Sequence, residues 1–344
     1  MNIKSLLLGS AAALVAVTGA RAADAVVVVP EPEPVEYVRV CDIYGAGFFY
    51  IPGTETCLAI GGYMRYQVHY QDQDIIGDDF WKFARFQLNV DARSESEWGT
   101  LRGYAEGRFD WHSLTGNSAY VNQVFIELIQ GAGTIRLGKT DTLYARFLGY
   151  GTPFGPFDGS YAFNNTGELS YTYNAGAFSA ALGVIELGST VGADSDFDVG
   201  IEGGVKFTGD SFWIGAMAGY DMFSEEWGAK GRAEVSFAPI TIGAMVFYSS
   251  GPSVYAIFSP AGGFSELSAA AYAKVDVTES LAIAGAVQWF DDTPVFADDV
   301  WQFTAGLDWR PIWSGGRGLR IRPEVQYTTE IEQLRVAVRF DRAF

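Results

Sequence analysis

The sequence contains one spacing that binds nucleotide phosphates in other proteins, the run GTIRLGKT from Gly133 to Thr140. A phosphate-binding loop needs a strand before it and a helix after it, so that backbone N–H groups can surround the phosphates. Here Ile135 and Leu137 alternate with polar residues, which indicates that the run lies within a strand. We therefore expect neither nucleotide binding nor any other cofactor.

The two histidines, His69 and His112, are the other residues with obvious chemical potential. Neither lies in the spacing of a Ser/His/Asp triad or of a metal site. A histidine on a polar surface is the simpler interpretation, so we expect no catalytic residue and no metal ion. A hydrolase, which would need one of the two as its base, is the weaker alternative.

The N-terminus has the pattern of a secretory signal peptide over residues 1–22. A basic head containing Lys4 precedes an apolar stretch from Leu6 to Val17, and Ala20-Arg21-Ala22 is a small-residue cleavage pattern. Cleavage would change the formal net charge from −18 to about −20, because two of the 23 basic residues are lost and all 41 acidic residues stay. Such an acidic chain is unsuited to nucleic acid. It could instead contact divalent cations, or an anionic glycolipid that divalent cations bridge to the protein.

The two cysteines lie in a chain that is predicted to be exported. Because an oxidising compartment favours disulfides, we predict a bond between Cys41 and Cys57 rather than free thiols or metal ligands. In the chain-entropy model such a bond contributes about 3 kcal/mol to stability. Residues 23–56 are expected to form an extended leader rich in Val and Pro, followed by a small disulfide-tied element.

From Cys57 onwards, apolar side chains recur at every second position, which is the period of a β-strand. In the first segment Ile60, Met64 and Tyr66 share one face, while Arg65 and Gln67 share the other. Although 49% of the residues are hydrophobic, no apolar run after the N-terminus approaches the ~20 residues of a transmembrane helix. Residues 57–344 are therefore predicted to be all-β, as a soluble sandwich or a closed barrel.

Three features favour the barrel. Charged residues occupy the polar face in strand after strand, as a water-filled lumen requires, and Trp and Tyr lie near segment ends, as in the girdles of a membrane interface. Long outer connections alternate with short inner ones, except for the longish 310–318 turn and the brief last outer loop near Glu330. Acidic residues concentrate in the outer connections. We predict a transmembrane antiparallel β-barrel of about sixteen strands in a Gram-negative outer membrane. The expected strand starts are Leu58, Asp79, Gly99, Tyr120, Gly133, Gly167, Ala177, Asp198, Ser211, Trp227, Ile240, Glu266, Leu281, Val300, Leu319 and Glu332.

The longest connection, residues 141–166, is rich in aromatic residues, Gly and Pro, which is typical of a compact loop. A sixteen-stranded barrel leaves an aqueous channel, and we predict that this third outer loop folds inward and narrows it. An ordinary surface loop is the alternative.

Opposite this loop, arginines from the first five strands would line one stretch of wall, and three acidic residues belong to the loop or border it. The basic residues are Arg65, Arg85, Arg102, Arg108 and Arg136, and the acidic ones are Asp141, Asp158 and Glu168. Opposite charges across a constriction create a transverse field. A compatible alternative is that each arginine pairs with a neighbouring carboxylate, such as Glu106 or Asp110.

Several runs resemble the general porins of alphaproteobacterial (rhizobial-type) outer membranes, and the resemblance extends along the whole chain. The runs are YVRVCD from Tyr37, FYIPGTETCL from Phe49, GGYMRY at 61–66 and IRLGKTD from Ile135. The segment from Cys41 to Cys57 and the GKTD run are the most specific parts of the resemblance. The resemblance implies a homotrimer of sixteen-stranded barrels, each narrowed by its third loop. The C-terminal Phe344, which ends an alternating strand, resembles the signal by which the barrel-assembly machinery recognises its clients.

Taken together, these features predict a general diffusion porin in contact with outer-membrane lipid and lipopolysaccharide. Small hydrophilic solutes and ions would cross passively, with a slight preference for cations from the acidic outer loops. Two alternatives stay open. A substrate-specific channel would be blocked by one solute with high affinity, and a structural or adhesin barrel, plugged by residues 23–56, would not conduct.

Overall fold

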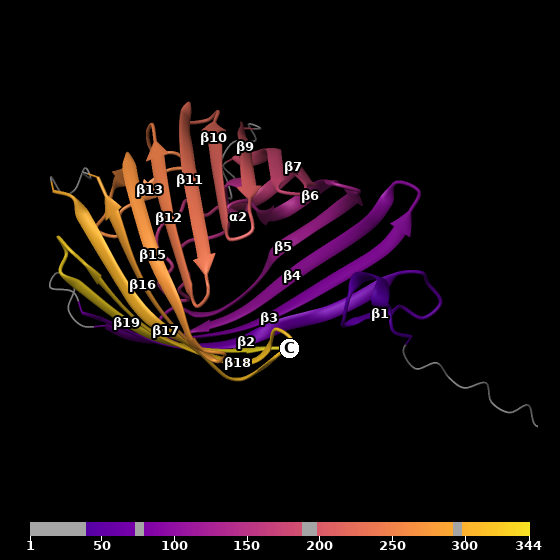
Figure 1. Cartoon of the computed structure of the whole chain (residues 1–344), viewed down its shortest axis with the longest axis horizontal. Helices are drawn as coiled ribbons and strands as arrows, with labels where there is room; N and C mark the ends of the chain where they lie inside the picture. The colour runs from indigo at the N-terminus through magenta and orange to yellow at the C-terminus, as the bar shows by residue number, and fades with distance from the viewer. Residues whose placement is uncertain (1–38, 73–78, 188–197, 292–297) are drawn as a thin grey trace, which may run out of the picture. The chain divides into compact units, whose positions relative to one another are not determined.

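The computed structural model describes residues 39–72, 79–187, 198–291 and 298–344. The predicted signal peptide (1–22) and nearly all of the leader lie outside the described residues. Val40–Phe344 form one compact unit, in which sixteen antiparallel strands close a ring because β19 (Gln333–Ala343) pairs with β2 (Cys57–Asp72). The sixteen-stranded barrel is thus confirmed. Figure 1 shows neighbouring strands of the chain lying side by side in the wall.

The other strands of the ring follow one another in chain order, each paired with its sequence neighbours. They are β3 (Asp79–Ser96), β4 (Gly99–His112), β5 (Gly116–Gln130), β6 (Gly133–Asp141), β7 (Asn165–Ala175), β8 (Phe178–Leu187), β9 (Asp198–Thr208), β10 (Phe212–Asp221), β11 (Glu226–Phe237), β12 (Ile240–Ser249), β15 (Leu267–Thr278), β16 (Leu281–Phe290), β17 (Val300–Ser314) and β18 (Arg317–Thr328).

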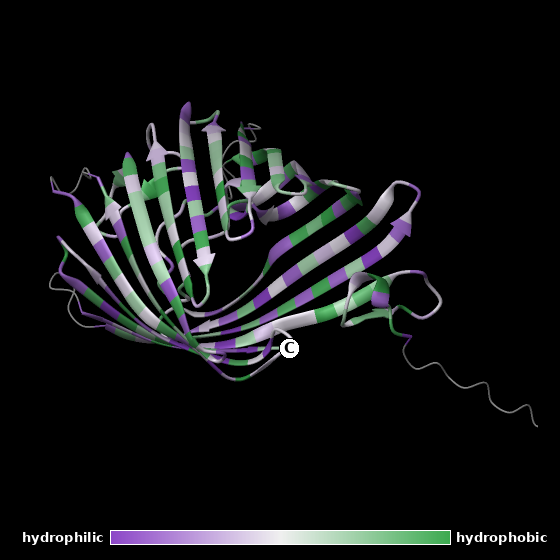
Figure 2. Ribbon diagram, viewed as in Figure 1, coloured by the Kyte–Doolittle hydropathy of each residue, from purple (hydrophilic) through white to green (hydrophobic). Residues whose placement is uncertain are grey.

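Polarity along the strands is the reverse of that in a soluble sandwich. In β2 the apolar Met64 is 56% exposed, whereas Gln67 on the opposite face is only 6% exposed. The same alternation of hydrophobic and hydrophilic residues runs along the strands in Figure 2. Apolar side chains therefore face outward and polar ones inward, as a membrane barrel with a wet lumen requires.

All predicted strand starts but one lie within two residues of the observed starts, and two larger differences concern β5 and the connection between β17 and β18. β5 begins at Gly116 rather than near Tyr120, because pairing with β4 continues beyond a register shift at Glu106/Gly107. The expected long 310–318 connection is wrong, because strand continues through most of it and the turn is only Gly315-Gly316. A register shift between Trp309 and Ile312 accommodates Pro311, which has no N–H to donate to the ladder.

Connections differ in length at the two ends of the barrel. Short turns, such as 131–132 and 238–239, join strands at one end, while the other end carries residues 142–164 and 250–266. The first of these, called the third loop below, contains α2 (Leu143–Arg146), and the second contains β13 (Ile257–Phe258) and β14 (Phe264–Ser265). Several acidic residues of the long connections lie in 73–78, 188–197 and 292–297, outside the described residues. Within the described ranges, no helix is long and apolar enough to cross a membrane.

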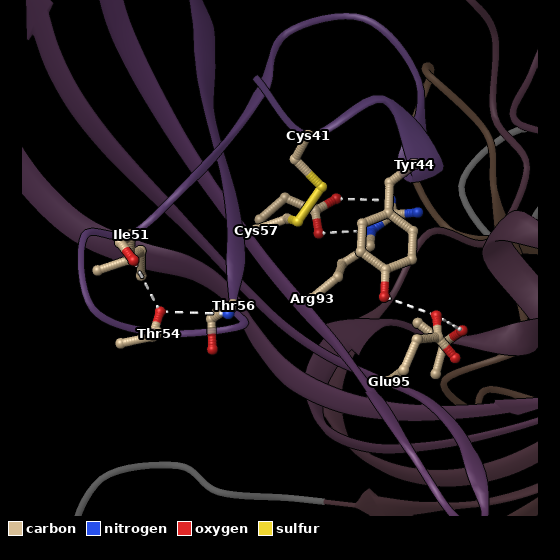
Figure 3. Close-up of a disulfide and its surroundings, with 10 residues drawn as sticks. Cys41, Tyr44, Ile51, Thr54, Thr56, Cys57, Arg93 and Glu95 are labelled. Carbon is tan, nitrogen blue, oxygen red and sulfur yellow. Dashed lines mark hydrogen bonds and ion pairs between the residues drawn. A yellow bond between two sulfur atoms is a disulfide. The ribbon is translucent and has the colours of Figure 1, made fainter. Parts of the chain in front are cut away.

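The disulfide-tied element packs at the short-turn end. The predicted bond between Cys41 and Cys57 is formed, with the Cα atoms 6.0 Å apart, and it joins η2 (Asp42–Tyr44) and β1 (Phe48–Tyr50) to β2. The Arg93 guanidinium of β3 lies over the Tyr44 ring, 5.6 Å from its centroid (Figure 3). Burial and a 2.6 Å hydrogen bond to Glu95 raise the pKa of Tyr44 to about 12. The element is therefore attached to lumen-facing residues of β3.

Candidate functional site

The third loop begins with a short helix that is held by carboxylates of the barrel wall. Thr142 caps α2, accepting a hydrogen bond from the backbone N–H of Ala145. The N–H of Leu143 donates to Glu168 of β7, and the N–H of Tyr144 donates to Glu202 of β9, both at 2.8 Å. These bonds satisfy N–H groups that lack partners within the helix, so the loop turns inward as soon as it leaves β6.

Apolar packing then seats the helix on the inner face of β8–β10. Leu143, Tyr144 and Leu148 are each at most 2% exposed and form one cluster with residues such as Ile185 and Met217. Gly215 of β10 provides the space, because a Cβ atom there would lie 2.4 Å from Leu148 Cδ2. The first half of the loop is thus fixed against one side of the lumen.

The middle of the loop reaches strands on another part of the ring. The backbone N–H groups of Gly155 and Phe157 donate to the two carboxylate oxygens of Glu324 in β18, at 2.6 and 3.0 Å. Ser160 exchanges hydrogen bonds with Gln288 of β16, at 2.9 and 2.8 Å. A loop that leaves from β6 and binds β16 and β18 must cross the lumen, which confirms the inward-folded third loop.

The five arginines predicted to line one wall all form ion pairs with neighbouring carboxylates. The pairs are Arg65–Asp341 at 2.6 Å, Arg85–Asp110 at 2.8 Å, Arg102–Asp91 at 2.9 Å, Arg108–Glu106 at 2.8 Å and Arg136–Glu127 at 2.7 Å. The alternative that these arginines have local partners therefore holds. Because each positive charge has a negative neighbour, this stretch of wall is polar but close to neutral.

Three further arginines of the lumen were not singled out from the sequence: Arg322, Arg335 and Arg339. Ring closure places β19 beside β2, and Arg339 there donates a hydrogen bond to Gln67. Arg335 lies over the Phe157 ring of the loop, 4.7 Å from its centroid. Among the described residues, neither Arg335 nor Arg339 has a carboxylate within 4.0 Å. Their alternation with Val336 and Val338 signalled a lumenal face, but only closure shows which strand they adjoin.

The three predicted acidic residues occupy different positions. Glu168 forms a 2.6 Å ion pair with Arg146 at the start of the loop. Asp141 accepts hydrogen bonds from the Tyr150 hydroxyl at 2.6 Å and from Asn165 at 2.7 Å. Among the described residues, neither of these carboxylates forms an ion pair with any of the five predicted arginines.

Asp158 is the predicted loop carboxylate on which two arginines of the wall, Arg339 and Arg322, act electrostatically. Its carboxylate accepts a hydrogen bond from the Tyr161 hydroxyl at 3.2 Å. Burial raises the pKa of Asp158 to about 6, while Tyr161 and the more distant Arg339 and Arg322 oppose that rise. The structure therefore brings one predicted acid near β18 and β19, rather than near β2–β6.

The two histidines and the Gly133–Thr140 run, the candidates for catalysis and phosphate binding, make contacts typical of a barrel wall. His69 stacks on Trp81 with ring centroids 4.8 Å apart, and its Nε2 contacts Gln67 at 2.9 Å. His112 Nδ1 accepts a 3.2 Å hydrogen bond from the Leu114 backbone. The Gly133–Thr140 run lies within β6, as predicted. Within the described ranges, no group of three His, Cys, Asp or Glu side chains is arranged to hold a metal ion.

The C-terminal residue is attached to the outer side of the ring. The Phe344 N–H donates to Gly62 O at 3.1 Å, and its ring stacks on Phe86 with centroids 6.3 Å apart. Its predicted role as an assembly signal stays a prediction.

Comparisons with known proteins agree with this architecture. Residues 24–339 match the model of a family described as "Porin subfamily". The chain is 42% identical over 263 residues to Porin Omp2b of Brucella canis and of Brucella suis biovar 1, covering 69% of this chain and 70% of each relative. Two mutants of the Rh. blastica porin have a TM-score of 0.61, at 17% and 16% identity, covering 83% of this chain and 100% of theirs. The similarity to the Rh. blastica porin shows a shared fold.

Proposed function

This chain belongs to the porin subfamily and is a general diffusion porin of an outer membrane, and we propose that solutes cross it between the third loop and the wall formed by β3–β5. The observation that carries this path is the loop's own hydrogen bonding. Among the described residues, bonds from 142–164 reach β7, β9, β11, β16 and β18, and none reaches β3–β5. The part of the wall formed by β3–β5, which carries Arg85, Arg102 and Arg108, is therefore left facing the channel.

Transport by this path needs no chemistry. The ring of paired strands satisfies the backbone groups within the membrane, and charged side chains keep the lumen wet, so small polar solutes follow their gradients. We propose that Arg65, Arg85, Arg102, Arg108 and Arg136 form one side of the narrow region. Asp141, at the end of β6, would border this region, with Glu168 holding the start of the loop in place and Asp158 on the part of the loop that lies near β18 and β19.

We also propose a weak cation preference. The excess of acidic residues over the chain concentrates cations near the channel, and the paired arginines offer little net positive charge to oppose it. Arg335 and Arg339 would limit the preference rather than reverse it. A reversal potential showing strong anion selectivity would contradict this proposal.

Assembly and export are proposed from the family resemblance and the sequence pattern. Signal cleavage before Ala23 would give the mature chain, which N-terminal sequencing of the exported protein tests. A homotrimer surrounded by outer-membrane lipid and lipopolysaccharide is supported by the apolar outward face, where Phe86 and Phe109 stack 5.9 Å apart. Native mass spectrometry of the detergent-extracted protein tests the trimer.

Single-channel recording in planar bilayers tests the transport function. A general porin gives steady conductance that sugars do not block with high affinity. High-affinity block by one solute would favour the substrate-specific alternative, and the absence of conductance would favour a structural barrel.

A further inference from the structure

A cleft of about 490 Å³ lies between the second half of the third loop and the loop that follows β12. This volume falls within the range of about 300–1,000 Å³ that is usual for sites of small molecules. Residues of both loops line it, among them Asp158, Ser160, Tyr161, Phe163, Ser253 and Phe258. None of the residues lining it is Lys or Arg.

Two aromatic residues of the third loop, Tyr161 and Phe163, line this cleft, and the Tyr150 ring packs against both. Tyr150, Tyr161 and Phe163 form a triad in which each pair of ring centroids is 6.2 Å apart. Phe163 is 50% exposed and Tyr150 is 43% exposed, although the loop that carries them crosses the lumen instead of facing lipid. Rings that are exposed in a water-filled channel do not stabilise the protein by apolar burial. Their faces carry the negative side of the ring quadrupole, which attracts cations.

The charge at the triad has the same sign as the ring faces. The hydroxyls of Tyr161 and Tyr150 donate to Asp158 and Asp141, at 3.2 and 2.6 Å. Among the described residues, neither carboxylate has a Lys or Arg nitrogen within 4.0 Å, unlike the carboxylates of the arginine wall. The arginines that act on Asp158, Arg339 and Arg322, belong to the wall and not to the cleft lining. A partly buried carboxylate without a close counter-ion is favourable to a bound cation.

We propose that this cleft binds an organic cation, with a methylated ammonium group against the faces of Tyr161 and Phe163 and with Asp158 as its counter-charge. Weakly hydrated quaternary ammonium groups are the cations that aromatic faces recognise best. Anions gain nothing here, because no basic side chain lines the cleft. A neutral sugar could use the same rings and hydroxyl groups, but it would not use the charge of Asp158. The inference deepens the proposed function, since it rests on a water-filled lumen and adds a solute class that the channel retains.

Choline chloride is the probe, applied to the purified full-length protein. Equilibrium binding is measured by calorimetry in detergent, and K⁺ current is measured in planar bilayers with and without choline. We expect saturable binding and a saturable reduction of K⁺ current, with glucose binding much more weakly. Phe163→Ala and Asp158→Asn should each weaken choline binding roughly tenfold, as expected for the loss of one cation–π or ionic contact.

Matched controls separate the site from general effects. Phe223→Ala removes a ring that is 75% exposed and outside the cleft, and Asp210→Asn removes a carboxylate in the turn between β9 and β10. Neither should change choline affinity. Phe163→Tyr keeps an aromatic face and should bind choline as the parent does, which distinguishes loss of the ring from a disturbed loop.

The outcomes distinguish this proposal from the proposed function. Choline affinity that is unchanged in both Phe163→Ala and Asp158→Asn, or glucose binding as tight as choline binding, overturns the organic-cation site. K⁺ conductance without any effect of choline also overturns the site, while leaving the porin function intact. Choline binding without K⁺ conductance supports the site and refutes the open channel.

Discussion

Replacing Glu324 by glutamine should loosen the middle of the third loop from the barrel wall. The Glu324 side chain is only 3% exposed, and its two oxygens accept the N–H groups of Gly155 and Phe157 at 2.6 and 3.0 Å. Glutamine keeps one acceptor oxygen but presents an NH₂ group to the second N–H. Glu324→Gln therefore removes one charge-assisted hydrogen bond and makes the other neutral.

The size of the effect follows from these two bonds. A hydrogen bond to a charged group contributes about 1.5–3 kcal/mol, and a neutral one contributes about 1 kcal/mol. Losing one bond and weakening the other should cost about 2–5 kcal/mol. Since 1.4 kcal/mol is a factor of ten, the ratio of attached to released loop should fall by roughly 30- to 4,000-fold. The hydrogen bonds between Ser160 and Gln288 remain, so release should be local to the middle of the loop.

Single-channel recording should detect this release as increased open-channel noise and as passage of larger neutral polymers. Glu106→Gln is the matched control, because it removes the same charge from a buried carboxylate of β4 that pairs with Arg108 and makes no hydrogen bond to the third loop. If both variants show the same noise and the same polymer cutoff, Glu324 does not anchor the loop and the reasoning is refuted.

Three further perturbations have defined outcomes. Burial raises the pKa of Asp158 to about 6 from its ordinary 3.8. Between these pH values the folded loop binds a proton that the unfolded chain does not bind. The contribution of Asp158 to the stability of the folded loop is therefore lost as pH rises through 6. The same protonation should reduce cation selectivity between pH 7 and pH 5 in reversal-potential measurements, and Asp158→Asn should abolish that step. Replacing Cys41 and Cys57 together by serine should lower the free energy of unfolding by about 3 kcal/mol in urea titrations, with conductance retained in the folded fraction; an unchanged midpoint would contradict a stabilising role. Arg335→Gln with Arg339→Gln should shift the reversal potential toward cations more than Arg85→Gln does, because Arg85 is paired with Asp110; equal shifts would count against this account of the wall.

The local sequence determined the strands and the side that each one turns to water. Strict alternation predicted the first residue of β3, β4, β6, β9, β12, β16 and β17 as the structure has it, at Asp79, Gly99, Gly133, Asp198, Ile240, Leu281 and Val300. Alternation is sufficient because successive side chains of a strand point to opposite faces. A membrane barrel needs one apolar face in every strand, so the signal repeats along the chain. The composition of residues 141–166 likewise indicated a compact loop.

Only the tertiary structure decided which charges meet. Closure of the ring pairs Arg65 with Asp341, residues 276 positions apart, and places Arg335 and Arg339 beside β2. The path of the loop brings Gly155 to Glu324 and leaves Asp158 near β18 and β19. Such contacts depend on where distant strands lie in space, whereas a period of two reports only the face of each residue on its own strand.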